Sequence, residues 1–221
     1  MSGSSKRPVS KWQRFRQKDV FVRNASRLGV RSRSFFKLEE LDQQFKLLKS
    51  GMTVLDLGAS PGGWSQYAQS KVGNKGMVLA TDVLSMQPLS GVQFVQCDLA
   101  GNDAPMRLFD HLQQRKVDLV LSDMAPNITG NATIDSRNYF DLYAAIFKIC
   151  EVVLIESGAL AFKFFQTEET SILKQNCKIL FDSCKIYKPQ SSRSTSQESY
   201  MVSKIYHPQN MAESPLAPRF T

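Results

Sequence analysis

The sequence predicts an α/β protein with a mainly parallel sheet, on three observations. Short β-branched runs alternate with longer amphipathic segments between about residues 35 and 207, a pattern typical of helices packed on a parallel sheet. The last two strand-like runs, 183–189 and 199–207, have no helix between them and predict an antiparallel hairpin at one sheet edge. A glycine-rich turn directly follows the first strand-like run, where such sheets bind ligands.

The spacing of apolar residues places the individual elements. Two polar segments between them, 125–137 and 191–199, are expected to be loops that face a substrate, with Arg193 as a phosphate contact. Helices are predicted over 35–48, 64–72, 105–115, 139–154 and 169–180, and strands over 52–58, 76–83, 92–99, 117–126, 158–165, 183–189 and 199–207.

Composition indicates one domain in a reducing compartment. The chain has 221 residues, 42% of them hydrophobic, which is enough for one sizeable core. No apolar run approaches the length that crosses a bilayer. The four cysteines form no C-x-x-C pair, which argues against a zinc site or a disulfide framework and favours the cytoplasm.

Positive charge is concentrated at the N-terminus. Ten Lys or Arg and one acidic residue fall within residues 1–33, whereas the remaining chain carries 18 basic and 19 acidic residues. We interpret residues 1–30 as a basic, partly mobile arm that binds RNA, residues 31–207 as the main domain and residues 208–221 as a mobile tail. A mitochondrial presequence and a solubilising extension are the two alternatives for the arm.

The turn in VLDLGASPGGWSQ combines flexible backbone with the start of a predicted helix. Gly58 and Gly62 allow the backbone to approach a ligand closely, and a helix N-terminus favours carboxylate or phosphate. The turn lacks the G-x-G-x-x-G spacing of dinucleotide-binding folds. Asp56, directly before the turn, is expected to accept backbone N–H groups and steady it.

Acidic residues at successive strand ends narrow the choice of ligand. Asp82 ends the second predicted strand and is placed to accept the hydroxyls of a ribose, while Asp98 ends the third and is placed to accept from an adenine amine. Trp64 is expected to cover the bound group. An adenosyl ligand without a pyrophosphate, best met by S-adenosyl-L-methionine, is therefore the predicted cofactor.

Seven segments spread along the chain carry a resemblance to a known family: SRSFFKLEEL, LDLGASPGGWSQ, ATDV, CDL, SDMAPN, FKFFQ and SRSTSQESY. On these segments the chain resembles the RlmE (FtsJ) family of ribose 2′-O-methyltransferases from about Trp12 to His207. This resemblance implies a Rossmann-like S-adenosylmethionine-dependent methyltransferase fold with a seven-stranded sheet. It also implies methylation of a uridine 2′-hydroxyl in 23S ribosomal RNA, on the large ribosomal subunit.

The same resemblance assigns the functional residues. The catalytic tetrad of the family falls on Lys37, Asp123, Lys163 and Glu198. Its cofactor contacts map onto Gly62, Trp64, Asp82, Asp98 and Asp123, to which the turn itself adds Gly58. No metal, DNA or membrane partner is expected, and the protein is expected to be a monomer.

Elementary chemistry is consistent with these assignments. A ribose hydroxyl is a poor nucleophile at neutral pH, and a lysine can take its proton only if burial or a second ammonium lowers the pKa of the amine. We expect Lys163 to accept or steer the proton, Asp123 to lie beside the transferred methyl, and Lys37 and Glu198 to position the nucleophile. Each residue taken singly is also compatible with an ordinary surface role.

Three alternative functions remain open at this level. The same chemistry serves transfer RNA or an mRNA cap, which the tetrad alone does not distinguish. A non-catalytic RNA-binding assembly factor would keep the scaffold without needing the tetrad. A nicotinamide-dependent oxidoreductase is disfavoured by the missing G-x-G-x-x-G turn.

Overall fold

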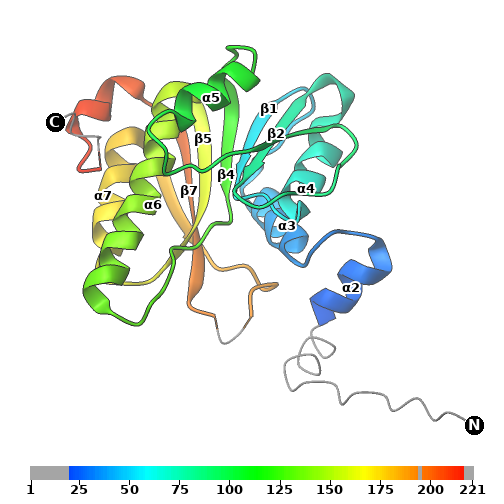
Figure 1. Cartoon of the computed structure of the whole chain (residues 1–221), viewed down its shortest axis with the longest axis horizontal. Coiled ribbons are helices and arrows are strands. Elements are labelled where there is room, and N and C mark those ends of the chain that lie inside the picture. Colours follow the sequence, from blue (N-terminus) through cyan, green and yellow to red (C-terminus); the bar gives the residue numbers. More distant parts are fainter. Residues whose placement is uncertain (1–19, 194–195, 217–221) are drawn as a thin grey trace, which may run out of the picture.

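The computed structural model describes residues 20–193 and 196–216. The β-branched runs form one seven-stranded sheet, and the amphipathic segments form helices on both of its faces (Figure 1). The strands are β1 Thr53–Leu57, β2 Met77–Asp82, β3 Val92–Gln96, β4 Val117–Ser122, β5 Leu154–Phe165, β6 Phe181–Tyr187 and β7 Glu198–Tyr206. The helices are α2 Val20–Leu28, α3 Ser34–Phe45, α4 Gly63–Val72, α5 Ala104–His111, α6 Ala132–Val153 and α7 Thr170–Leu180, with short 3₁₀ helices η1 Gly73–Lys75 and η2 Pro208–Glu213.

The strand order β3-β2-β1-β4-β5-β7-β6 confirms the predicted sheet. Neighbouring strands from β3 to β5 pair in parallel, and β7 pairs antiparallel with both β5 and β6. The hairpin therefore lies at the predicted edge, with its second strand inserted between β5 and β6. Because β7 runs in the opposite direction, its first residue lies at the same edge of the sheet as the last residues of β4 and β5.

Two apolar cores hold the layers together. One lies between the sheet and α5, α6 and α7 and includes Phe147, Phe162 and Leu173. The other lies between the sheet and α3 and α4 and includes Leu38 and Trp64. Strands buried on both faces read as continuous apolar runs, which explains why VLDL and VDLVLS were recognisable in the sequence.

Helix α6 begins seven residues earlier than predicted, so the expected loop over 125–137 is wrong in its second half. The side chain of Asn131 accepts hydrogen bonds from the backbone N–H groups of Thr133 and Ile134, at 3.1 and 3.2 Å. Asp135 accepts from Thr129 and Gly130 and ties the loop to this first turn. Polar capping residues stabilise the N-terminus of the helix here. Because they are polar, a prediction based only on apolar spacing assigns them to a loop.

Parts of both predicted terminal segments are folded. Residues 20–28 of the arm form α2, where Ala25 is buried and the ring of Phe21 lies 5.7 Å from that of Phe36. In the tail, residues 208–213 form η2, which packs on α7 and buries Met211, and Leu216 beyond it is also buried. The more basic part of the arm, 1–19, and residues 217–221 lie outside the described residues.

Candidate active site

Four elements converge at the carboxyl edge of the sheet. Asp123 directly follows β4, Lys163 lies near the end of β5, and Glu198 is the first residue of β7. Lys37 reaches the same point from the buried face of α3. The fold therefore gathers all four residues of the predicted tetrad, which are separated by up to 161 positions in the sequence.

The tetrad forms a chain of alternating charges. Lys37 Nζ lies 2.8 Å from Glu198 Oε1 and 3.8 Å from Asp123 Oδ1. Lys163 Nζ lies 3.3 Å from the same Asp123 oxygen and also donates to the backbone carbonyl of Asp123. The four side chains are only 9–20% exposed, which rules out the surface interpretation of each residue. One carboxylate thus lies between two partly buried ammonium groups.

Tyr200 is a member of this network that the sequence analysis missed. Its hydroxyl accepts from Lys37 Nζ at 3.0 Å and donates to Asp123 Oδ1 at 2.7 Å. It faces Lys163 directly in the β5–β7 register. The sequence carried one usable signal, because Tyr200 lies two positions after Glu198 and shares its face of the strand.

Burial and charge shift the pKa values in the network in opposite directions. Desolvation is the largest single influence on Glu198 and works to raise its pKa, but Lys37, Ser192 and Lys163 together outweigh it and the pKa is lowered. Desolvation and the neighbouring Asp123 raise the pKa of Tyr200 well above its usual value. Glu198 is therefore an anion and Tyr200 a neutral phenol at physiological pH, which fixes the direction of their hydrogen bonds.

A cavity of about 400 Å³ opens beside the tetrad at the ends of β1, β2 and β3. Its wall includes Gly58, Asp82 and Asp98 among the predicted cofactor residues, together with Met124, which follows Asp123. Gly58 has φ +72°, and an added Cβ would lie 2.1 Å from Met124 Cγ. A side chain at this position would therefore occupy the space that glycine leaves between the turn and the cavity wall.

The two wall aspartates also order their own loops. Asp82 accepts the backbone N–H groups of Ser60 and Leu84, at 2.9 and 2.8 Å, and so links the glycine turn to the end of β2. Asp98 accepts from the N–H of Ala100 at 3.0 Å. Each carboxylate orders its loop and can still serve the predicted ligand, because each also borders the cavity.

Two residues at the turn lie differently from what the sequence led us to expect. The Trp64 side chain does not line the cavity, because it is 2% exposed in the α3–α4 core, where its indole N–H donates to the carbonyl of Ser34 at 2.9 Å. Its assignment as a cofactor contact stays a prediction. Asp56 Oδ2 accepts the hydroxyl of Ser65 at 2.6 Å, while its Oδ1 is buried without a partner. Asp56 therefore anchors the start of α4 rather than the N–H groups of the turn.

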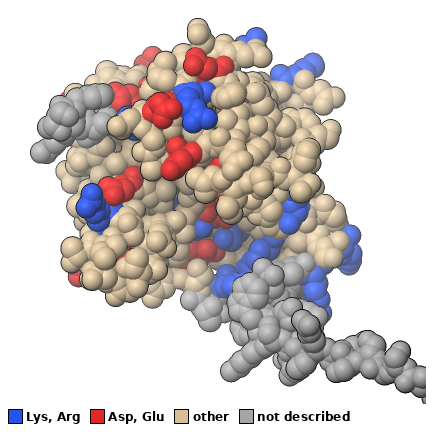
Figure 2. All heavy atoms as spheres, viewed as in Figure 1, with Lys and Arg blue, Asp and Glu red and all other residues tan. Residues whose placement is uncertain are grey.

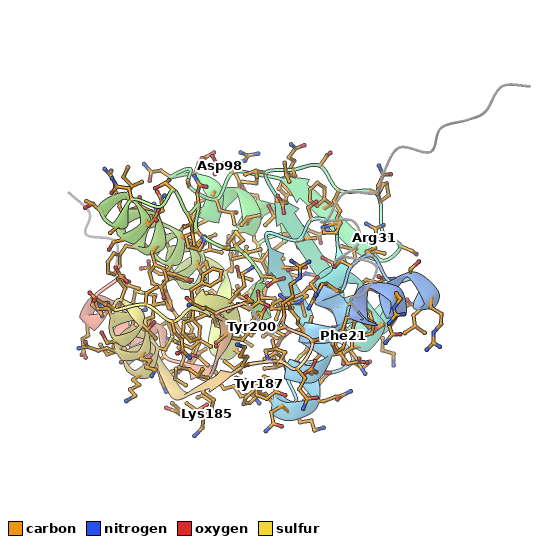
Figure 3. The ribbon with its side chains drawn as sticks, turned by 90° about the horizontal axis from the view of Figure 1, so that it is seen from below. Phe21, Arg31, Asp98, Lys185, Tyr187 and Tyr200 are labelled. Carbon is orange, nitrogen blue, oxygen red and sulfur yellow. The ribbon has the colours of Figure 1, made fainter. Side chains whose placement is uncertain are left out.

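Arginines gather on the other side of the tetrad. Arg31 donates to the carbonyls of Pro61, Gln87 and Pro88, and Arg33 donates to that of Ser191. Figure 2 shows Lys and Arg side chains grouped at the lower part of the molecule, where α2 lies, and Figure 3 shows Tyr200 near the centre of the molecule with Arg31 toward its edge. A cavity of about 410 Å³ there is bordered by Arg31, Arg33 and Arg193.

Contacts with α3 hold the start of the 191–199 segment. Glu40 accepts the backbone N–H groups of Gln190 and Ser191, at 2.6 and 2.8 Å, and so ties the start of the segment to α3. Burial and the nearby Arg193 lower the pKa of Arg33. Residues 194–195 lie outside the described part of the chain.

Neither a metal nor a membrane span is indicated within residues 20–193 and 196–216. No three His, Cys, Asp or Glu side chains in these ranges are grouped as metal ligands. None of the helices there is both long and apolar enough to cross a bilayer.

The sequence matches a known family and a curated protein over most of its length. The FtsJ-like methyltransferase family matches residues 30–206. The chain is 42% identical over 193 residues to the ribosomal RNA large subunit methyltransferase E of Buchnera aphidicola, a match that covers 87% of this chain and 94% of that protein.

Solved structures show the same fold. One is a structure described as a ribosomal RNA methyltransferase of Plasmodium falciparum, with a TM-score of 0.71 and 30% identity over 80% of this chain and 98% of the other. A fibrillarin/Nop5p complex matches with a TM-score of 0.51 and 16% identity over 72% of this chain and 75% of the other, a likeness in fold alone.

Proposed function

This chain belongs to the FtsJ-like methyltransferase family, and from that premise we propose that it methylates a ribose 2′-hydroxyl of a uridine in the 23S RNA of the large ribosomal subunit. The observation that carries the proposal is the convergence of the four tetrad residues next to the cavity bordered by Gly58, whose wall includes Met124, the residue after Asp123. A curated relative that is 42% identical over 193 residues is named as a ribosomal RNA large subunit methyltransferase, which supports this substrate class.

The wall of the 400 Å³ cavity fits S-adenosylmethionine, the cofactor of this family. Carboxylates of Asp82, Asp98 and Asp141 border it, and no Lys or Arg appears among its lining residues in the described chain. Carboxylates accept hydrogen bonds from ribose hydroxyls and amines, whereas a pyrophosphate would be repelled. This charge pattern supports an adenosyl group over a dinucleotide, in agreement with the missing G-x-G-x-x-G spacing.

When bound, the cofactor supplies a sulfonium methyl group as electrophile. We assign to the chain the tasks of holding the acceptor ribose and handling its proton. With the cofactor bound, Lys163 would accept or steer the proton of the acceptor 2′-hydroxyl, so that the oxygen could take up the methyl group. Proton transfer of this kind is worth about 10²- to 10⁴-fold in rate.

The other network members act by position. Asp123 holds Lys163 and Tyr200, and Glu198 holds Lys37. Because these groups are mostly shielded from water, their mutual orientation is kept without reorganisation during the reaction. The arrangement thus supports alignment of the attacking oxygen as the second contribution to the rate.

The arginine-lined side of the site is placed to bind RNA. Arg31, Arg33 and Arg193 border one cavity, and clustered cations favour binding to phosphate by counterion release. The basic residues in 1–19, outside the described part, add to this charge in sequence. We place the reaction in the cytoplasm, which the four free cysteines support.

The decisive experiment compares ribose methylation in cells that lack the gene, complemented with wild type or with the Lys163→Ala variant. We expect one 2′-O-methyl group to disappear from large-subunit ribosomal RNA and to return only with wild type, while Lys163→Ala still binds S-adenosylmethionine. Loss confined to transfer RNA would shift the proposal to that substrate. Full activity of Lys163→Ala would reject the mechanism.

A further inference from the structure

A second cavity, of about 460 Å³, lies beyond the ends of β4 and β5 and has no role in the mechanism above. It is enclosed by the loop after β4, the first turns of α6 and the loop between β5 and α7. Figure 1 shows these segments together at the lower left, at the same edge of the sheet as the tetrad. Its apolar wall consists of Pro126, Ile128, Ala132, Tyr139 and Phe165.

This cavity borders the catalytic network. Phe165 lies two residues after Lys163 in β5, so their Cα atoms are about 7 Å apart and their side chains share one face of the strand. Phe165 is also the direct cross-strand partner of Glu198. Pro126, at the opposite wall, follows Asp123 by three residues. A nucleotide whose ribose reaches Lys163 therefore has its base within reach of Phe165.

The chemistry of the cavity excludes phosphate and suits a nucleobase. Its charged lining residues are Asp135, Glu168 and Glu169, and it has no Lys or Arg among those described. Phosphate would be repelled there, in contrast to the arginine-lined cavity on the other side of the tetrad. A nucleobase is flat and neutral, packs on apolar or aromatic groups, and offers N–H donors to carboxylates.

The acidic side chains of this cavity differ in whether they are free to accept a hydrogen bond from a base. Asp135 already accepts from Thr129 and Gly130, and the pKa of Glu169 is lowered first by a hydrogen bond from Ser136. These bonds hold the walls of the cavity in place. Glu168 is exposed at its rim, which makes it the side chain placed to meet a donor on an incoming base.

We propose that this cavity receives the nucleobase of the methyl-accepting nucleotide, turned out of its stack so that the 2′-hydroxyl reaches Lys163. The inference rests on the proposed function and adds the site that holds the base. Phosphates lie on the arginine side, the ribose lies at the tetrad and the base lies between the α6 and α7 N-termini. Enzymes that act within structured nucleic acid commonly extrude the target nucleotide in this way.

Ile128→Ser tests the cavity wall, with Ile134→Ser as its matched control. Both side chains are exposed, at 64% and 48%, and only Ile128 lines the cavity. With full-length protein and large ribosomal subunits from cells lacking the gene, we expect Ile128→Ser to raise KM for the subunit about tenfold, the order of one lost base contact. Its kcat and its affinity for S-adenosylmethionine should match wild type and the control. Equal KM values for the two variants would overturn the proposal.

An RNA segment spanning the mapped position identifies which base is bound. An abasic ribonucleotide at the acceptor position keeps the 2′-hydroxyl and removes the base. RNA that carries it should bind wild type more weakly than intact RNA does. Ile128→Ser should bind the abasic and the intact RNA equally, because the variant has already lost the contact with the base. If the losses of binding from Ile128→Ser and from the abasic acceptor simply add, the acceptor base is not the occupant of the cavity. The same conclusion follows if the two losses fail to add only when a neighbouring nucleotide is abasic. If wild type transfers no methyl to RNA, the proposed function fails; if only the cavity variants are without effect, the base site alone fails.

Discussion

Asp56 provides a test of the electrostatics beneath the glycine turn. It is 1% exposed, and desolvation raises its pKa from the usual 3.8 to about 7, against the hydrogen bond from Ser65. The nearby carboxylates of Asp82 and Asp123 raise it further. Replacement by asparagine keeps the shape of the side chain and removes its ability to ionise.

The direction in which the free energy of unfolding changes with pH follows from the proton that Asp56 binds. Between pH 3.8 and about 7 the folded state keeps a proton on Asp56 that the unfolded chain has lost, so the free energy of unfolding of wild type falls as pH rises through this window. The whole effect is about 4 kcal/mol, with about 1.4 kcal/mol for each pH unit. Above pH 7 the folded protein carries the buried charge and the loss is complete.

Urea unfolding of wild type and Asp56→Asn at pH 5 and pH 8 measures this effect. We expect wild type to lose about 3 kcal/mol relative to the variant between the two conditions, because part of the window lies below pH 5. All other titrating groups are shared and cancel in the comparison. A difference that stays constant between pH 5 and pH 8 would refute the reasoning and show that Asp56 is not protonated in the folded protein.

The remaining predictions concern the turn, the core, the tetrad and the charge. Gly58→Ala should lower the free energy of unfolding by about 2 kcal/mol and weaken cofactor binding, because φ of Gly58 is +72° and Met124 blocks the new Cβ. Gly130→Ala is the control, because Gly130 has a similar φ but no atom within 4 Å of an added Cβ. An equally large loss of unfolding free energy in Gly130→Ala would show that Met124 contributes nothing. Trp64→Ala should lower unfolding free energy by about 3–5 kcal/mol in calorimetry, and an unchanged value would contradict its place in the core. Glu198→Gln should reduce the rate of single-turnover methyl transfer about tenfold or more, since Lys37 loses its nearest charged partner. The affinity for S-adenosylmethionine, measured by titration calorimetry, should stay near wild type. An unaltered rate would remove Glu198 from the mechanism. The logarithm of the RNA association constant should fall linearly with the logarithm of salt concentration, with a shallower slope after deletion of residues 1–19. Identical slopes would exclude the arm from RNA binding.

Local rules explain which elements could be predicted. β1 and β4 are short apolar runs that become fully buried strands, and α4 begins directly at the predicted glycine turn. The start of α6 was missed because it depends on the side chain of Asn131 and on Asp135 holding the preceding loop. The docking of Met211 on α7 could not be predicted either, because it depends on a distant surface rather than on neighbouring residues.

The sequence by itself determined the fold class, the acidic strand ends and the identities of the four tetrad residues. Periodicity, turn chemistry and family resemblance are properties of the chain, and they need no knowledge of distances. Only the tertiary structure decided that Tyr200 links Lys37 to Asp123 and that Trp64 belongs to the core. It also decided that Phe165, the cross-strand partner of Glu198, lines a cavity with no Lys or Arg among its described lining residues. These features arise where strands and helices distant in sequence come together, because contact, burial and charge there depend on packing between elements.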